Sequence, residues 1–122
     1  MSKIILSIHP QHVEKIISGE KRFEFRKVKA KIPPEKIIIY STSPVSQVIG
    51  EAEVANILID TPEKLWKLTS VYSGVDKKFY QKYYQNKQEA VAYQLKNVTV
   101  YPEPKKLLEY GISTAPQSFV YI

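Results

Sequence analysis

The most informative stretch of this chain is GEKRFEFR, residues Gly19–Arg26. It follows a short pattern in which Val13, Ile16 and Ile17 recur at helical spacing, and Gly19 suits the position just after a helix end. The alternation of phenylalanine with charged residues then predicts a half-buried strand. A strand this rich in Lys, Arg and Glu either lies on a solvated face or lines a polar site.

The 122 residues predict one domain, residues 1–122, large enough to bury a core without disulfides. There is no cysteine, which excludes thiolate metal sites and cysteine nucleophiles and fits a cytoplasmic protein. With only His9 and His12 available, we expect no protein-built metal site and no cofactor. No apolar run approaches the roughly 18 residues of a membrane span, and the apolar N-terminus is too short for a signal peptide. We therefore expect a cytoplasmic protein with no membrane partner. The sequence leaves its oligomeric state open, with a monomer favoured.

The net charge of +6 favours a polyanionic partner. Residues 20–31 hold six basic residues against Glu20 and Glu24, and a second basic group surrounds the aromatic residues of positions 79–84. Lysines of this kind also simply solvate exposed faces, and the charge pattern leaves both interpretations open.

Hydrophobic patterning predicts further strands at residues 4–8, 36–40, 45–59, 90–101 and 119–122. Gly50 indicates a bulge, Pro102 and Pro104 indicate a turn, and Gly111 closes a short helical turn at residues 105–110. About six strands therefore dominate, and helices do not follow them regularly. This pattern is typical of an α+β, mainly β fold: a small, mostly antiparallel β-barrel with short helices inserted.

Two helices are expected between residues 61 and 84. Thr61-Pro62-Glu63 is a strong helix start, and Leu65, Leu68 and Tyr72 then share one apolar face, with Trp66 beside it in the core.

Asp76 can cap the second helix, which runs through Tyr84. There, Phe79 and Tyr83 are spaced as a buried pair, while Tyr80 and Tyr84 share an adjacent face with lysines.

The spacing Gly19-x-Lys21-x-x-Glu24-x-Arg26 after a short helix resembles the signature of the ASCH domain, a family of the PUA-like superfamily of small β-barrels. Residues 37–44 resemble the family's central strand and its small-polar loop, residues 48–54 the strand that follows, and residues 115–119 its closing segment. The resemblance thus covers nearly the whole chain.

The resemblance implies a barrel with an open cleft where Lys21, Glu24 and Arg26 gather. PUA-like relatives bind RNA or modified nucleobases, and some ASCH proteins are ribonucleases. A subgroup hydrolyses the acetyl amide of acetylated cytidine with a Lys, a Thr nucleophile and a distant Glu. This chain has Glu24 at the position of the Thr, and a carboxylate does not replace a hydroxyl in that acyl chemistry.

Strand geometry places Glu24 and Arg26 on one face, where they can pair. Lys21 has the opposite parity and joins them only if it lies at the junction before regular pleating begins. If the three converge, Arg26 supplies a planar fork for a phosphate or a base edge, and Glu24 can accept hydrogen bonds or a proton. An exposed Glu24–Arg26 ion pair without function is the alternative.

Further candidates follow from side-chain chemistry. Tyr40 can stack on a base, and Ser41, Thr42, Ser43, Gln117 and Ser118 offer small polar groups at strand ends; these five could equally cap turns or strand ends. His9 is expected at the helix entry and His12 in solvent. Phosphate-backbone contacts are expected from Arg22, Lys27, Lys29, Lys78 and Lys82.

The leading hypothesis is an RNA- or nucleotide-binding module built on Lys21, Glu24 and Arg26. The alternative is a ribonuclease or a modified-nucleoside hydrolase in which Lys21 and Glu24 are catalytic; against it stand the missing nucleophile and the absence of an obvious histidine pair. A regulatory protein-interaction domain is a third possibility, which no residue supports directly.

Overall fold

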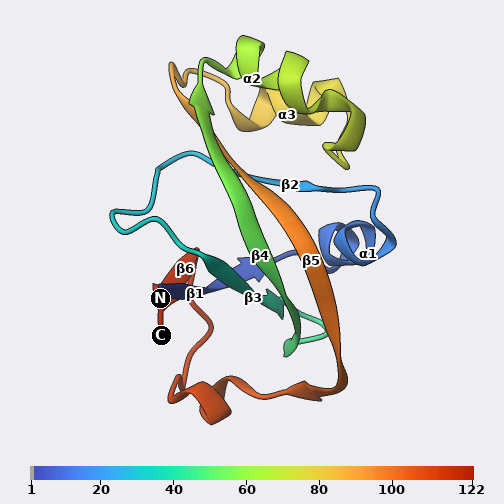
Figure 1. Ribbon diagram of the computed structural model, residues 1–122, viewed down its shortest axis with the longest axis vertical. Helices are drawn as coiled ribbons and strands as arrows, with labels where there is room; N and C mark the ends of the chain where they lie inside the picture. The colour runs from blue at the N-terminus through green and yellow to red at the C-terminus, as the bar shows by residue number, and fades with distance from the viewer. Residues whose placement is uncertain (1) are drawn as a thin grey trace.

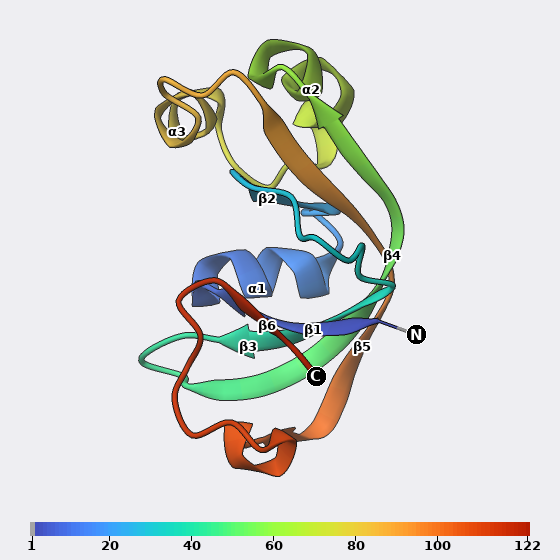
Figure 2. The same cartoon turned by 90° about the vertical axis from the view of Figure 1, so that its left-hand side faces the viewer.

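Six strands form one curled sheet in a computed structural model that describes residues 2–122 (Figures 1 and 2). The strand order is β2-β5-β4-β3-β1-β6. β1 and β3 are parallel, and all other neighbouring pairs are antiparallel. The strands are β1 (Lys3–Ile8), β2 (Phe23–Arg26), β3 (Lys36–Ser41), β4 (Gln47–Asp60), β5 (Ala90–Lys105) and β6 (Phe119–Tyr121).

Short helices lie between the strands along the chain, and the predicted α+β, mainly β architecture is confirmed. The sheet is a half-barrel, because β2 and β6 stand at its two ends and do not pair with each other. The helices are α1 (Pro10–Ser18), α2 (Pro62–Thr69) and α3 (Lys77–Tyr83), with 3₁₀ turns η1 (Ser70–Tyr72) and η2 (Leu107–Tyr110).

The hydrophobic core includes separate clusters on the two faces of the sheet. Residues 4, 6 and 8 of β1 belong to the cluster that Val13 and Ile16 of α1 cover. Ile5 has the opposite parity and packs with Ile38 and Tyr40 on the other face, against η2. The consecutive residues Ile4–Leu6 of β1 are therefore all apolar and buried, as expected where a strand is covered on both faces.

A separate cluster joins β2 to the α2–α3 segment. Phe25 of β2 makes edge contacts with Tyr80 of α3 and with Tyr84 just after it, with ring centroids 5.1 and 6.4 Å apart, and Leu65 of α2 is fully buried beside them. α3 is thereby anchored to the edge strand that carries the charged motif.

Local start and stop signals are confirmed. Gly19 ends α1 with φ of 87°, Gly111 follows η2 with φ of 77°, and Thr61 and Asp76 cap α2 and α3 by accepting from Lys64 N and Phe79 N. These signals depend on a few neighbouring residues only, which is why they can be read locally.

The predicted faces of the two helices were wrong in part. α2 buries Leu65 and packs Trp66 against the core as expected, but Leu68 is 65% exposed and Thr69 is buried instead. Tyr80 of α3 and Tyr84 just after it are buried and Phe79 is 47% exposed, the reverse of the expected arrangement. A short helix has several possible apolar faces, and the sheet it packs against selects one of them.

The predicted turn at Pro102 and Pro104 was also wrong, because β5 continues through both to Lys105. β2 pairs with residues 91–94 only, so the later part of β5 has β4 as its one neighbour. Proline lacks an N–H but is tolerated on such an edge. Close approach of β5 explains Gly50: a Cβ there would collide with the carbonyl oxygen of Thr99, and the pairing shifts register at this point.

Candidate active site at the α1–β2 junction

Lys21 lies at the junction between α1 and β2, before the pleat of β2 begins. Its N–H donates to Lys15 O at 3.0 Å, and the next N–H, of Arg22, donates to Tyr72 O at 2.8 Å. Two non-strand hydrogen bonds therefore hold this turn. They free Lys21 from strand parity, and its Nζ lies 3.8 Å from Glu24 Oε1.

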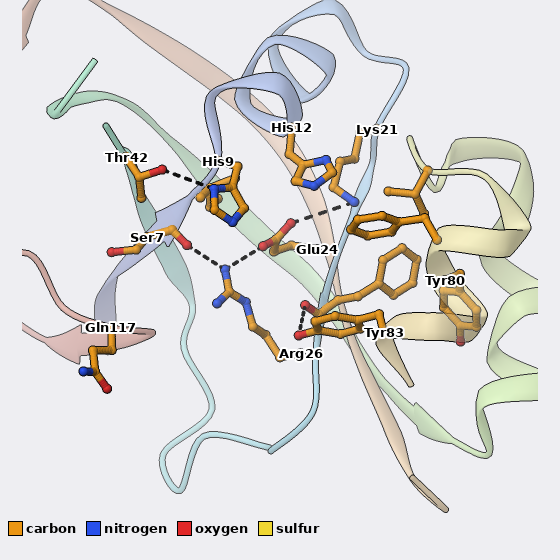
Figure 3. Close-up of a pocket in the computed structure, with 14 residues that line it drawn as sticks. Ser7, His9, His12, Lys21, Glu24, Arg26, Thr42, Tyr80, Tyr83 and Gln117 are labelled. Carbon is orange, nitrogen blue, oxygen red and sulfur yellow. Dashed lines mark hydrogen bonds and ion pairs between the residues drawn. The ribbon is translucent and has the colours of Figure 1, made fainter. Parts of the chain in front are cut away.

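Glu24 and Arg26 project from β2 toward β1. Glu24 Oε2 accepts from Arg26 Nη2 at 2.6 Å, and the same Nη2 donates to Ser7 O of β1 at 2.9 Å (Figure 3). Arg26 thus bridges the edge strand β2 to β1 across a seam that no strand pairing closes. Glu24 is only 6% exposed, which argues against the alternative of an exposed ion pair without function.

The Lys21 ammonium is almost completely covered. It donates to Ser73 O at 2.8 Å and lies 4.7 Å from the centre of the Phe25 ring. Desolvation lowers the pKa of Lys21 from its ordinary value, and Glu24 opposes that shift. The ammonium is held by a carboxylate, a carbonyl and a ring face.

Residues 72–74, the last residue of η1 and the two after it, form a strap over Lys21. Three consecutive carbonyls, those of residues 72–74, accept from Arg22 N, Lys21 Nζ and Lys15 Nζ. Gly74 packs directly on the lysine stem: a Cβ at Gly74 would lie 2.5 Å from Lys21 Cβ. The position of Lys21 is therefore set by a segment about 50 residues away in sequence.

These side chains face a cavity of about 270 Å³ between α1, β2 and α3, close to the lower end of the range for small-molecule sites. Such a volume suits one nucleobase or nucleotide. Its lining is Ser7, Ile8, His9, His12, Lys21, Glu24, Phe25, Arg26, Thr42, Val75, Phe79, Tyr80, Tyr83 and Gln117.

Two histidines from the start of α1 border the cavity. Their ring centroids are 6.3 Å apart, His9 Nδ1 lies 3.4 Å from Thr42 Oγ1, and the His12 ring meets the edge of Phe79 at 5.6 Å (Figure 3). His12 Nδ1 is buried without a hydrogen-bond partner among residues 2–122. Burial, and secondly the charge of Lys21, lower the pKa of His12 from its ordinary 6.5. His12 is thus a neutral base at neutral pH.

A family model for the ASCH domain matches residues 6–99, most of the chain and all of these elements from β1 into β5. The chain belongs to the ASCH domain family. Among solved structures it is similar to ASCH from Zymomonas mobilis, with 26% identity, a TM-score of 0.88, and coverage of 98% of this chain and 87% of that one.

One relative of similar sequence carries the same domain name. The ASCH domain-containing ribonuclease of Zymomonas mobilis is 30% identical over 97 residues, 76% of this chain and 64% of that protein. ATP synthase subunit alpha of Ureaplasma parvum is 32% identical over 122 residues, which are 98% of this chain but 15% of that protein. This ASCH chain therefore spans well under two thirds of that relative's length.

The structure brings some of the remaining predicted ligand residues of the ASCH domain to the cavity. Thr42 and Gln117 line it, and Ser118 Oγ accepts from Arg26 Nη1 at 3.4 Å. Thr42 precedes the turn after β3, and Gln117 and Ser118 precede β6, so both segments reach the seam that Arg26 bridges.

Three others are not at the cavity. Tyr40 is 6% exposed in the cluster on the far face of β1 and β3, so its ring is not available to stack on a base. Ser41 is buried at the end of β3, and Ser43 is exposed in the following turn. Thr42 lies just beyond β3, where the regular pleat has ended, and of residues 40–43 it alone lines the cavity.

The residues expected to contact phosphates are all exposed: Arg22, Lys27, Lys29, Lys78 and Lys82. Two of them stack on rings, Arg22 on Tyr72 at 3.9 Å and Lys27 on Tyr83 at 4.7 Å. In residues 2–122 no group of histidine and acidic side chains could hold a metal ion, and no helix is long and apolar enough to cross a membrane.

Sequence reasoning missed the histidine pair of this ASCH domain. It placed His12 in solvent and counted the lack of an obvious pair against an enzyme, but the two rings share one cavity. A signal was present: His9 and His12 are three residues apart at a helix start, a spacing that puts both on one face directly after a buried strand.

Proposed function

We propose that this ASCH chain binds single-stranded RNA and cleaves it at the cavity between α1, β2 and α3. The observation that carries the proposal is His12, a base whose pKa is lowered by burial and by the Lys21 ammonium, in a nucleotide-sized cavity that also presents an arginine fork. The Zymomonas mobilis relative named as a ribonuclease supports the same reaction class.

The reaction is transfer of the phosphodiester to the neighbouring 2′-oxygen. Neutral His12 takes the proton of the ribose 2′-hydroxyl, whose oxygen forms a bond to phosphorus while the bond to the 5′-oxygen breaks. His9, in its protonated form, gives a proton to the departing 5′-oxygen. The products are a 2′,3′-cyclic phosphate and a 5′-hydroxyl end, so that atoms and charge balance.

Arg26 and Lys21 stabilise the negative charge that grows on the phosphate oxygens. Arg26 is the more accessible, with its side chain 17% exposed and Nη1 engaged only by Ser118 at 3.4 Å. That nitrogen can turn to a phosphate oxygen while Nη2 stays on Glu24 and Ser7. Lys21 acts from behind as a fixed charge in a site of low dielectric.

Glu24 positions the two cations. Both of its carboxylate oxygens are directed to them, Oε1 to Lys21 and Oε2 to Arg26. This occupation explains why the residue at this position is not the nucleophile of an amide hydrolysis. A phosphotransfer of this kind needs no protein nucleophile, since the substrate supplies its own hydroxyl. We expect the activity in the cytoplasm.

The test is cleavage of a fluorescently labelled single-stranded RNA by the wild-type chain and by His12→Ala. General acid–base catalysis contributes about 10²–10⁴-fold, so we expect at least a hundredfold loss. Gln11→Ala, exposed on the same helix turn, is the matched control. Mass spectrometry should find the cyclic phosphate, and a 2′-deoxy linkage at the cleavage position should resist.

Cleavage that persists in His12→Ala, or that does not need the 2′-hydroxyl, contradicts this mechanism. Tight RNA binding by the wild-type chain without any turnover indicates the binding module instead of the enzyme.

A further inference from the structure

A second, larger hollow lies between α2 and α3 and has about 970 Å³ of space. It is separate from the candidate active site and shares only Tyr80 with it. Its charged side chains are four lysines against one acid, Glu63: Lys64 and Lys67 of α2, Lys77 of α3, and Lys87 after α3. All four lysines are exposed, so their ammonium groups are available to a polyanion.

The groove also has an aromatic wall. Trp66 lines it, and its ring centroid lies 4.6 Å from that of Tyr80, which holds the indole in place. Lysines around a fixed aromatic ring are the combination by which proteins hold single-stranded nucleic acid: cations follow the phosphates, and rings stack on bases of any identity.

α3 connects the groove to the cavity, because different faces of one helix line the two. Phe79 and Tyr83 face the cavity, and Lys77 and Gln81 face the groove. Helical spacing places Lys78 and Lys82 together on the outer face between these two, and both are exposed. A single nucleic-acid strand that leaves the cavity and crosses α3 would therefore meet a lysine before it enters the groove.

We infer that the α2–α3 groove is an extended binding site for the single-stranded RNA that flanks the cleaved nucleotide. The strand passes from the cavity over Lys78 and Lys82 into the groove, where Lys64 and Lys67 contact phosphates and Trp66 accepts a base. This inference rests on the proposed function and adds its substrate class: oligomeric single-stranded RNA, with no sequence readout in the flank, in preference to a nucleoside or a mononucleotide.

The experiment is fluorescence anisotropy with labelled 2′-O-methyl oligonucleotides, which lack the attacking hydroxyl and so report binding without cleavage. A dodecanucleotide should bind the wild-type chain more tightly than a tetranucleotide. The double variant Lys64→Gln/Lys67→Gln should weaken dodecanucleotide binding on the order of tenfold. Its slope of log affinity against log salt should become shallower by roughly 1.4, since each lost phosphate contact on a single strand removes about 0.7.

The matched control is Lys96→Gln/Lys106→Gln, which removes the same charge from exposed positions on β5 and just beyond it. It should leave dodecanucleotide binding within twofold of wild type. Equal affinity for short and long oligomers, equal effects of the two double variants, or tighter binding of a duplex than of the single strand would each overturn the groove assignment.

This readout separates the two proposals. If the wild-type chain cleaves no RNA but shows the length dependence and the Lys64/Lys67 effect, the nuclease fails and the groove stands. If it cleaves RNA through His12 without these effects, the nuclease stands and the groove fails.

Discussion

Two clusters in this ASCH chain each pair a glutamate with a lysine, but one cluster is buried and the other is partly exposed. In the cavity cluster (Lys21, Glu24 and Arg26), the carboxylate faces two cations, and the Lys21 and Glu24 side chains are 2% and 8% exposed. In the outer cluster (Lys36, Glu51 and Tyr101), Glu51 pairs with Lys36 Nζ at 2.6 Å and accepts a hydrogen bond from the Tyr101 hydroxyl at 2.9 Å. The two charged side chains are about a quarter exposed.

The pKa values of the two lysines move in opposite directions. Burial is the largest influence on Lys21 and lowers its pKa, whereas the hydrogen bond to Glu51 is the largest influence on Lys36 and raises its pKa. An accessible ion pair keeps its hydration and contributes little to stability. A buried ion pair loses its hydration, and this cost is offset only where the charged groups are well placed and hydrogen-bonded. The burial of the cavity cluster is therefore what distinguishes it, and it is the reason why we propose the cavity as the active site.

Removal of the carboxylate from each cluster should give the largest difference between them. Glu24→Ala leaves Lys21 and Arg26 buried without a counter-charge, and we expect the free energy of unfolding to fall by about 3–5 kcal/mol. Glu51→Ala is the control and should cost clearly less, because Lys36 is then free to be hydrated. Urea unfolding followed by circular dichroism measures both. Equal losses would mean that burial does not distinguish the clusters.

A subtler change displaces Lys21 without altering any charge. Gly74→Ala places a Cβ against the lysine stem at a residue whose φ is 71°. We expect about 1–3 kcal/mol from the backbone alone and a further loss from the contact, together with slower RNA cleavage. Gly111→Ala is matched in φ, at 77°, but has no atom within 4 Å of the new Cβ. If the two variants lose equal stability and activity, the strap does not position Lys21.

The smallest effect concerns pH. Because protonation of His12 removes the base, cleavage should fall as pH drops through a midpoint below 6.5, the ordinary pKa of histidine. Lys21→Gln removes one cause of the lowered pKa, so the titration of His12 should move to higher pH. Lys36→Gln in the outer cluster should not move it. NMR titration of the His12 ring protons measures this shift independently of activity, and an unchanged midpoint in Lys21→Gln would refute the coupling.

Much of the cavity cluster could be predicted from the motif. Spacing of two on a strand brought Glu24 and Arg26 together, and the structure joins them at 2.6 Å. Parity left Lys21 undecided, since its position depends on hydrogen bonds to Lys15 and to the strap. Helical spacing could place His9 and His12 on one face, but it could not show the contact of His12 with Phe79, which lies 67 residues later in the chain.

The sequence by itself determined the signals that act over a few residues. Gly19 and Gly111 end helical turns, and Thr61 and Asp76 begin helices. These are local because steric limits and single hydrogen bonds decide them.

Tertiary structure alone decided which faces are buried and where charges meet. β5 tolerates Pro102 and Pro104 because β2 is too short to cover that edge. α3 buries Tyr80 because β2 presents Phe25 to it, and Arg26 joins β2 to β1 because the half-barrel leaves a seam there. The physical reason is common to all three: desolvation depends on what the rest of the chain places nearby, and neighbours in sequence do not specify that.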